Sequence, residues 1–320
     1  MPAPRNVEDM VRAARMYYLD NLSQTAVAKE LHLSTSTVSR ILAAAREQGI
    51  VEIRIHDPGL LAHVPELEER ISSAFHVSSA TVVPRPRGRA PVDVVAAAAA
   101  RCFEQRAAQL TTFGLSWGVT IDKFVEECHV EPIKTGLTIC PLVGGLPAEA
   151  GPAGNTSLDV LAMKSGARAL RFDAPSVVES PLTWAALNSE STITQAVQRA
   201  ASVEMAFVGI GSYGFHNSNR VVNAMQLSDA EFAQLSAQRP TGDICGRFFD
   251  INGEPLGLPT SERIIGISMD QLRAIPDAVG LAAGVEKAPG VVGALRTGAL
   301  DSIILDEDLA RAVLNLAGVE

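Results

Sequence analysis

Apolar side chains recur with a helical period between Ser23 and Gly49, and the pattern predicts two short helices joined by a tight turn. The first helix is predicted from Gln24 to Leu31. The second begins after Ser34, a residue type that favours the N-cap position. Its buried face has the i, i+3, i+4, i+7 spacing and consists of Val38, Ile41, Leu42 and Ala45. The turn places His32 where glycine is usual.

The opposite face of the second predicted helix carries short hydroxyl side chains and one arginine. A solvated helix face is usually rich in Glu and Lys, so these residues need another explanation. Arginine can bind a guanine edge bidentately in the major groove, and hydroxyls reach bases or phosphates. An ordinary helical hairpin is the alternative. The pattern favours a helix-turn-helix whose candidate DNA contacts are Gln24, Thr35, Ser36, Thr37, Ser39 and Arg40.

Flanking segments complete a small N-terminal domain. Residues 7–20 have the spacing of a supporting helix, and Gly49 is suited to end the second helix of the pair. The alternating segment 50–55 then predicts a strand, as in a winged helix-turn-helix. Arg54 on that strand either touches backbone phosphate or faces solvent. We place this DNA-binding domain at residues 1–56.

Residues 57–90 are predicted to form a linker and a linker helix. Asp57, Pro58 and Gly59 break the chain, and Pro65 opens a helix. The apolar stripe of that helix either forms a dimer seam or docks on the chain's own body; it consists of Leu67, Ile71 and Phe75. A proline-rich connection follows, whose arginines either attract phosphate or stay solvated: Arg85, Arg87 and Arg89.

From residue 91 onward, an alanine-rich helix at 91–110 is followed by apolar runs that alternate with helical patterns. This rhythm predicts an α/β domain at 91–320, with a parallel sheet covered by helices on both faces. The predicted strand runs are 110–118, 136–145, 169–175, 203–212, 242–249, 263–269, 278–284 and 300–307. Such sheets bind ligands at the carboxyl ends of their strands.

Charge divides unevenly along the 320-residue chain, whose net charge is −9. Residues 1–56 contain seven Lys and Arg against six Asp and Glu, a net charge of +1. Residues 57–320 contain 20 against 30, a net charge of −10. The acidic body is therefore excluded as the nucleic-acid surface. A single copy of this weakly basic DNA-binding domain should bind DNA poorly. We therefore expect a homo-oligomer that places several copies of the domain on one operator.

Composition narrows the setting of the protein. The chain is 47% hydrophobic but lacks an apolar run of about 18 residues, so we predict no membrane span. Its N-terminus lacks the hydrophobic region of a signal peptide. The four cysteines lie far apart without a CxxC pair, which favours reduced thiols in a cytoplasmic protein. We predict neither a metal site nor a cofactor.

Several ordered sequence blocks carry a resemblance to a known family: YYLDNLSQTAVAKEL with VSRIL, then LSWGVT, PLVGGL, VGIGS, GDI and AAGVEKA with ILDEDLA. Over nearly its full length the chain resembles the SorC family of sugar-binding transcriptional regulators. The resemblance implies a Rossmann-like effector domain similar to glucosamine-6-phosphate deaminases and ribose-5-phosphate isomerases. It also implies double-stranded operator DNA, a phosphorylated sugar or polyol as effector, and assembly into dimers or tetramers.

The residues of GLSWGVT support a phosphate site, because glycines and hydroxyls stand where a strand should give way to a helix. The alternative is a glycine-rich turn that binds nothing. Lys287 follows a later strand run and matches the phosphate-binding lysine of the related enzymes. Asp243 resembles the family's acidic ligand contact, and Asn155 is either a ligand contact or an N-cap. The candidate effector contacts are Ser116, Trp117, Gly118, Thr120, Gly144, Gly145, Asn155, Asp243 and Lys287.

A sugar-phosphate isomerase or deaminase joined to a DNA-binding head is the competing function. Such an enzyme needs a general base beside the substrate's first two carbons. The segment GIGSYGFHN resembles the deaminases' GIG-x-DGH block, but Tyr213 stands where the acidic residue would be and His216 is one residue too far. We therefore predict a regulator that is not an enzyme. The pattern does not name the sugar or say whether it activates or represses.

Overall fold

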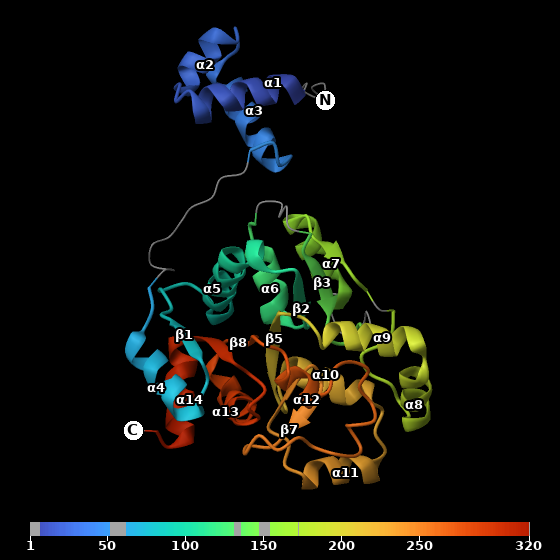
Figure 1. Cartoon of the computed structure of the whole chain (residues 1–320). Helices are drawn as coiled ribbons and strands as arrows, with labels where there is room; N and C mark the ends of the chain where they lie inside the picture. The colour runs from blue at the N-terminus through green and yellow to red at the C-terminus, as the bar shows by residue number, and fades with distance from the viewer. Residues whose placement is uncertain (1–6, 52–61, 131–135, 147–153, 172, 320) are drawn as a thin grey trace. The chain divides into compact units, whose positions relative to one another are not determined.

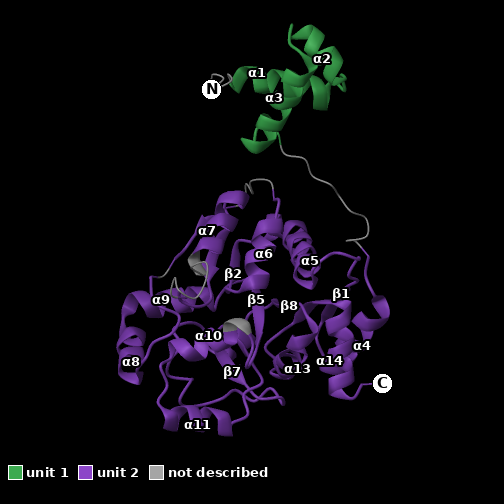
Figure 2. Ribbon diagram, turned by 180° about the vertical axis from the view of Figure 1, so that it is seen from behind, with its two compact units in different colours: residues 1–57 green, residues 58–320 purple. Residues whose placement is uncertain are grey.

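The computed structural model describes the chain except residues 1–6, 52–61, 131–135, 147–153, 172 and 320 (Figure 1). The side chains of residues 154, 155, 216 and 217 are also outside the description. The chain forms two compact units, residues 1–57 and 58–320 (Figure 2). Most of the predicted wing strand, including Arg54, and the predicted linker at 57–59 lie outside the described residues.

The N-terminal unit contains the predicted helices. They are α1 (Val7–Ala14) with its π-helical continuation η1 (Arg15–Leu19), α2 (Gln24–Glu30) and α3 (Thr35–Glu47). Ser34 caps α3, as predicted, because its hydroxyl accepts a hydrogen bond from the Thr37 amide at 3.2 Å. Ser23 caps α2 in the same way.

A small apolar core holds these helices together. Val38 and Ile41 of α3 are buried against Val27 and Ala28 of α2 and Met10 of α1. The predicted apolar stripe therefore faces the unit's interior. The turn between α2 and α3 places His32 at φ 53°, in the left-handed region that favours glycine.

The larger unit is built on a parallel sheet. Its described strands follow the order β1-β9-β8-β5-β2-β3-β4, with a β6–β7 hairpin attached to β5. The bounds are β1 Ser79–Val83, β2 Thr112–Leu115, β3 Thr138–Pro141, β4 Arg168–Ala169, β5 Met205–Ser212, β6 Gly242–Ile244, β7 Arg247–Phe249, β8 Ala278–Ala282 and β9 Ser302–Asp306. At the centre, Leu115 pairs with Phe207, which also pairs with Val279.

Helices cover both faces of this sheet, as predicted (Figure 1). One face packs on α5, α6 and α7, where Phe207 joins an aromatic cluster with Phe113 and Phe124. Ala206 and Val208, the neighbours of Phe207, point to the other face, which packs on α4, α13 and α14. This alternation follows from the two-residue period of a strand.

The remaining bounds follow. The principal helices are α4 Pro65–Phe75, α5 Pro91–Arg106, α6 Val119–Glu127, α7 Gly154–Ser165, α13 Ala288–Arg296 and α14 Glu307–Ala317. The others are η3 Ala107–Gln109, α8 Pro181–Ser189, α9 Ser191–Ala200, α10 His216–Ala224, α11 Asp229–Ala237, α12 Met269–Arg273 and η5 Val285–Lys287. No helix in the described part of the chain is long and apolar enough to cross a membrane.

Helix α4 begins at Pro65, as predicted, and docks on the chain's own body. Leu67 and Ile71 are almost fully buried in the same core as α14. The Glu68 carboxylate accepts a hydrogen bond from the amide of Val82 in β1 at 2.8 Å. The apolar stripe of α4 thus packs against the core of its own chain.

Four features of the sheet differ from the predictions. The predicted run 169–175 contributes only Ala169 to a strand, β4. The run 242–249 is an antiparallel hairpin, because Cys245 and Gly246 both have positive φ (53° and 75°), as a two-residue type I′ turn requires. The run 263–269 forms only isolated bridges to Val143 and Val177 instead of a strand. Strand β1 was not predicted; it adds the edge next to β9.

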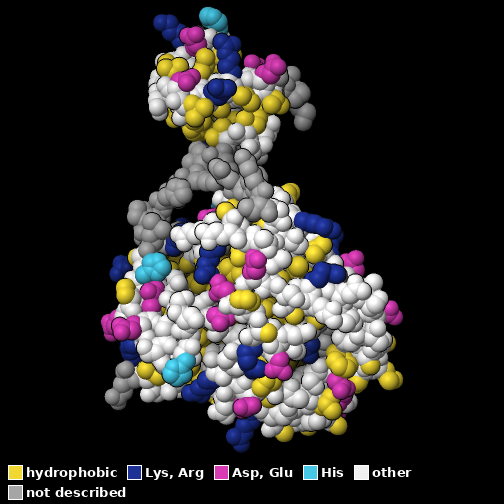
Figure 3. All heavy atoms as spheres, in the orientation of Figure 1, with side chains coloured by type: hydrophobic (Ala, Val, Ile, Leu, Met, Phe, Trp, Pro, Cys, Tyr) yellow, Lys and Arg dark blue, Asp and Glu magenta, His cyan; other side chains and the backbone are white. Residues whose placement is uncertain are grey.

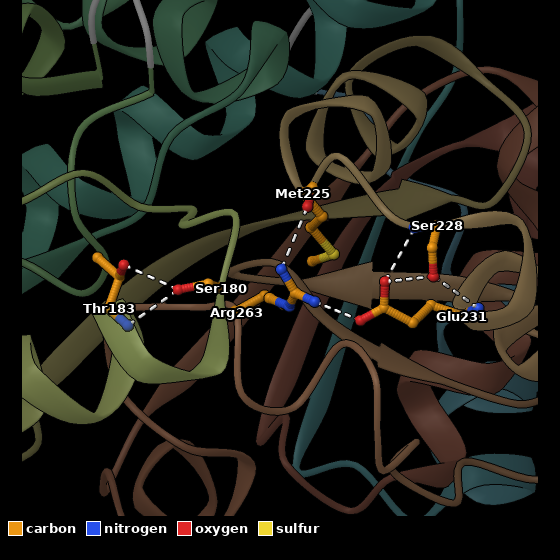
Figure 4. A network of polar contacts seen from close by, with 6 residues as sticks. All are labelled: Ser180, Thr183, Met225, Ser228, Glu231 and Arg263. Atoms are coloured by element: carbon orange, nitrogen blue, oxygen red, sulfur yellow. Dashed lines mark hydrogen bonds and ion pairs between the residues drawn. The ribbon is translucent and has the colours of Figure 1, made fainter.

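A buried arginine links three segments of the larger unit (Figure 4). The guanidinium of Arg263 donates to the Met225 carbonyl at the end of α10 and pairs with Glu231 of α11. Glu231 also closes a capping box with Ser228, accepting from its amide and hydroxyl at 2.8 Å each. These bonds fix the 260–264 segment to α10 and α11.

Candidate functional site

A cavity of about 400 Å³ opens at the carboxyl ends of β2, β5 and β8. β2 and β5 are neighbours in the sheet, but the chain continues from β2 towards one edge and from β5 towards the other. Ligands of open α/β sheets bind at such a reversal of strand order. The lining residues are Pro91, Val92, Trp117, Gly118, Val119, Thr120, Gly209, Ile210, Gly211, Ser212, Phe215, Ser218, Asp243, Cys245, Ala283, Gly284, Glu286 and Lys287.

The cavity gathers five of the candidate effector contacts: Trp117, Gly118, Thr120, Asp243 and Lys287. The Ser116 side chain is buried beside it, where its hydroxyl accepts a hydrogen bond from the Gly209 amide at 3.0 Å. Ser116 therefore ties the end of β2 to β5 and is not a lining residue.

Gly144 and Gly145 are not among the described residues that line the cavity. The amide of Gly144 donates to the Ile265 carbonyl at 2.9 Å, and the amide of Gly145 donates to the Ala174 carbonyl at 3.0 Å. These two amides are occupied by other backbone groups. Asn155 lies in the first turn of α7, and its side chain is outside the described residues.

The segment after β2 supplies a helix start to the cavity. Gly118 has φ 135°, a conformation that favours glycine, and it is the N-cap of α6. The next two residues, Val119 and Thr120, belong to the first turn of α6 and also line the cavity. The first amides of a helix have no partner within the helix, and together with the dipole they favour an anion.

Asp243 is a buried carboxylate at the cavity wall, only 4% exposed. Its Oδ1 accepts a hydrogen bond from the Ser218 hydroxyl at 2.7 Å, and its Oδ2 accepts from the Gly246 amide at 3.1 Å. Burial raises the pKa of Asp243, while these hydrogen bonds and the charge of Lys287 oppose the increase. A Cβ on Gly211 would lie 2.1 Å from Oδ1, so the close approach requires glycine there.

Lys287 is the partly buried cation of the cavity. It ends η5 and immediately precedes α13. Burial lowers the pKa of Lys287, while the carboxylates of Glu286, Asp243 and Asp306 raise it. Within the described part of the chain, its ammonium group forms no hydrogen bond or ion pair. It is thus a cation with donor capacity left for a ligand.

Several lining residues were not among the predicted contacts. Ser218 and Phe215 follow the GIGSYG block that was compared with the deaminases, so their place after β5 was the available signal. Glu286 adjoins Lys287 in sequence. Pro91 and Val92 start α5, far from the other contacts in sequence, and no local pattern marks them. The side chain of His216 lies outside the described residues.

In the N-terminal unit, the predicted DNA-contacting face of α3 is exposed at Thr35, Ser36, Ser39 and Arg40. Thr37 and Gln24 are partly buried. Arg40 Nε donates to the Ser36 carbonyl at 3.3 Å, so the guanidinium lies along the exposed face of the helix. In Figure 3, acidic and basic side chains are interspersed over the visible face of the larger unit.

A family model for a sugar-binding domain, Sugar-bind, matches residues 61–315. The chain belongs to this family. It is 28% identical over 319 residues to the sorbitol operon regulator of Klebsiella pneumoniae, covering 95% of this chain and 97% of that protein. It is 24% identical over 308 residues to the deoxyribonucleoside regulator of Bacillus subtilis, covering 95% and 96%.

Solved structures agree with this assignment. Full-length SorC, the sorbitol operon regulator of Klebsiella pneumoniae, matches with a TM-score of 0.70 at 27% identity, covering 95% of this chain and 98% of that chain. A DeoR family transcriptional regulator from Listeria monocytogenes matches with a TM-score of 0.70 at 29% identity, covering 78% and 99%. The chain is a SorC-type transcriptional regulator with a sugar-binding domain. The enzyme alternative is not favoured, since the named relatives are regulators.

Proposed function

We propose that this SorC-type regulator binds operator DNA through residues 1–56 and controls carbohydrate genes in the cytoplasm. Residues 57–90 connect this domain to an effector-binding and oligomerisation domain at 91–320, and the protein acts as a dimer or tetramer. A phosphorylated sugar or polyol in the cavity sets the operator affinity. The effector can change the operator affinity only by as much as its own affinity differs between two arrangements of the DNA-binding domains.

One observation carries the effector assignment: Lys287 and the first turn of α6 line the same cavity as the buried Asp243 carboxylate. The cation and the helix start favour a phosphate. The carboxylate accepts hydrogen bonds from sugar hydroxyls. A ligand with both an anionic group and hydroxyl groups therefore matches the residues that line the cavity.

Calorimetry on Lys287→Met tests the phosphate assignment. Methionine keeps much of the stem's volume but removes the charge-assisted hydrogen bonds, so affinity for a sugar phosphate should fall roughly ten- to a hundredfold. A thermal-shift screen of phosphorylated sugars and polyols beside their unphosphorylated forms supplies the ligand. At 100 times its dissociation constant, a ligand stabilises the protein by about 2.7 kcal/mol.

Lys123→Met is the matched control, because this half-buried lysine pairs with Glu126 on α6 and does not line the cavity. It should leave affinity unchanged. If phosphorylated and unphosphorylated ligands bind wild-type protein equally, or if Lys287→Met binds like wild type, the phosphate assignment is wrong. Sedimentation of the full chain tests the assembly, and a monomer that binds one half-site tightly would exclude it.

A further inference from the structure

Glu286 brings a second carboxylate to the cavity, directly beside Lys287. A Cβ built on Gly284 would lie 2.5 Å from Oε1 and 2.7 Å from Oε2 of Glu286. The carboxylate thus folds back over the backbone where η5 begins. Gly284 has a φ of 96°, a backbone conformation that favours glycine.

Glu286 and Lys287 are adjacent in the chain, and both line the cavity. Among the carboxylates that raise the pKa of Lys287, Glu286 contributes more than Asp243 or Asp306. Asp243 and Asp306 are held by hydrogen bonds, Asp306 from the amides of Gly284 and Leu309. The Glu286 carboxylate forms no hydrogen bond or ion pair within the described residues, and the residue is exposed. It is therefore the carboxylate that is free to move.

We propose that Glu286 is a tethered anion, which competes with the ligand's phosphate for Lys287 and is displaced when a cognate ligand binds. This inference rests on the proposed function, since it concerns the same phosphate. Two anions beside one cation repel each other, so a bound phosphate favours a Glu286 rotamer that turns the carboxylate away from Lys287. A ligand that also reaches Asp243 through hydroxyls overcomes this cost, whereas inorganic phosphate has no such contacts. Glu286 is then a specificity determinant that lowers the affinity for inorganic phosphate.

Titration of the full chain with inorganic phosphate tests the proposal on wild type, Glu286→Gln and the control Glu126→Gln. The control removes the same charge from the last turn of α6, outside the lining of the cavity. Glu286→Gln should bind phosphate roughly 1.5- to fivefold more tightly than wild type, the range for a charge interaction at an exposed position. Glu126→Gln should bind like wild type.

The double variant Glu286→Gln/Lys287→Met separates competition for Lys287 from a general change in charge. In the Lys287→Met background the gain from Glu286→Gln should largely disappear, because the two effects are coupled. An equal gain in both backgrounds, or no gain in Glu286→Gln, would overturn the proposal. The proposed function has its own failure signature, an unchanged affinity in Lys287→Met alone.

Discussion

The Ser218 hydroxyl donates to Oδ1 of Asp243 over 2.7 Å, and this bond joins α10 to β6, the strand that carries the carboxylate. The Gly246 amide, in the turn that follows β6, holds the other carboxylate oxygen. Both oxygens are thus fixed in the unliganded protein. A carboxylate that is positioned before the ligand arrives loses little conformational freedom on binding, which favours affinity.

Asp243→Asn should make the unliganded protein more stable near neutral pH while weakening effector binding. Burial raises the pKa of Asp243, so in wild type the ionised form opposes folding at neutral pH. An asparagine amide fits the same partners, since its oxygen can accept from Gly246 and its NH₂ can donate to Ser218. Binding falls because the amide accepts hydrogen bonds from sugar hydroxyls less strongly than a carboxylate does.

The sign of this effect fixes its pH dependence. A carboxyl with a raised folded pKa costs no stability below its unfolded pKa of about 4. The cost develops as the pH rises from that value through the folded pKa, and then stays constant. The melting temperatures of wild type and Asp243→Asn should therefore diverge as pH rises above about 4. Parallel curves would contradict the assignment of this cost to Asp243.

Gly211→Ala should disturb the same carboxylate without changing any charge. The new methyl group would lie 2.1 Å from Asp243 Oδ1, closer than any real contact, so the buried carboxylate has to leave its position. We expect lower stability and weaker effector binding together, measured by thermal melts and calorimetry. Gly257→Ala is the matched control, because a Cβ there meets nothing within 4 Å. Wild-type binding by Gly211→Ala would mean that the position of Asp243 does not matter.

The architecture could be predicted from sequence where a local pattern had one physical interpretation. The apolar residues of α3 at i, i+3, i+4, i+7 spacing and the N-cap Ser34 predicted this helix, and the structure confirms both features. The prediction of a parallel strand at 242–249 was wrong, because the apolar content of a segment does not indicate the direction of its strands. There, the backbone of Cys245 and Gly246 reverses the chain. Strand β1 was not predicted, because its apolar run is short and it pairs with only one neighbour, β9, at the edge of the sheet.

Some residues that line the cavity could be predicted from the sequence, and others could not. Strand ends followed by glycines and a lysine indicated Gly118 and Lys287, since parallel strands end at one edge of the sheet. Gly144 also follows a predicted strand and has the same local pattern. Its amide, however, donates to the Ile265 carbonyl, because the 263–267 segment lies against this part of the chain. Contacts from elements far apart in sequence, such as Val92 on α5, follow from tertiary packing alone.

Arg40→Ala should weaken specific operator binding by about 1–3 kcal/mol if the side chain reads a base. The residue is exposed, so folding should change little. Arg46→Ala, in the last turn of the same helix, is the control for lost charge. A mobility-shift titration on specific and unrelated DNA should show a larger loss for Arg40→Ala on the operator. Equal losses for both variants would assign Arg40 a purely electrostatic role.

Glu231→Gln should flatten the acid sensitivity of the larger unit. Hydrogen bonds from the Ser228 amide and hydroxyl, and then the charge of Arg263, lower the pKa of Glu231. A carboxylate with a depressed folded pKa stabilises the fold above its unfolded pKa, and this contribution is lost as the pH falls through the folded pKa. A glutamine side chain cannot titrate, so the variant should melt lower than wild type at pH 7 and approach it as the pH falls below about 4.

Asp229→Asn, in the same first turn of α11, is the matched control, because it removes an equal charge near the same helix start without touching Arg263. It should retain the wild-type difference in melting temperature between pH 7 and acid. None of Ser228, Glu231 and Arg263 lines the cavity, so both variants should bind the effector normally. If Glu231→Gln lost as much stability in acid as wild type, the Arg263 network would not be the source of the acid sensitivity.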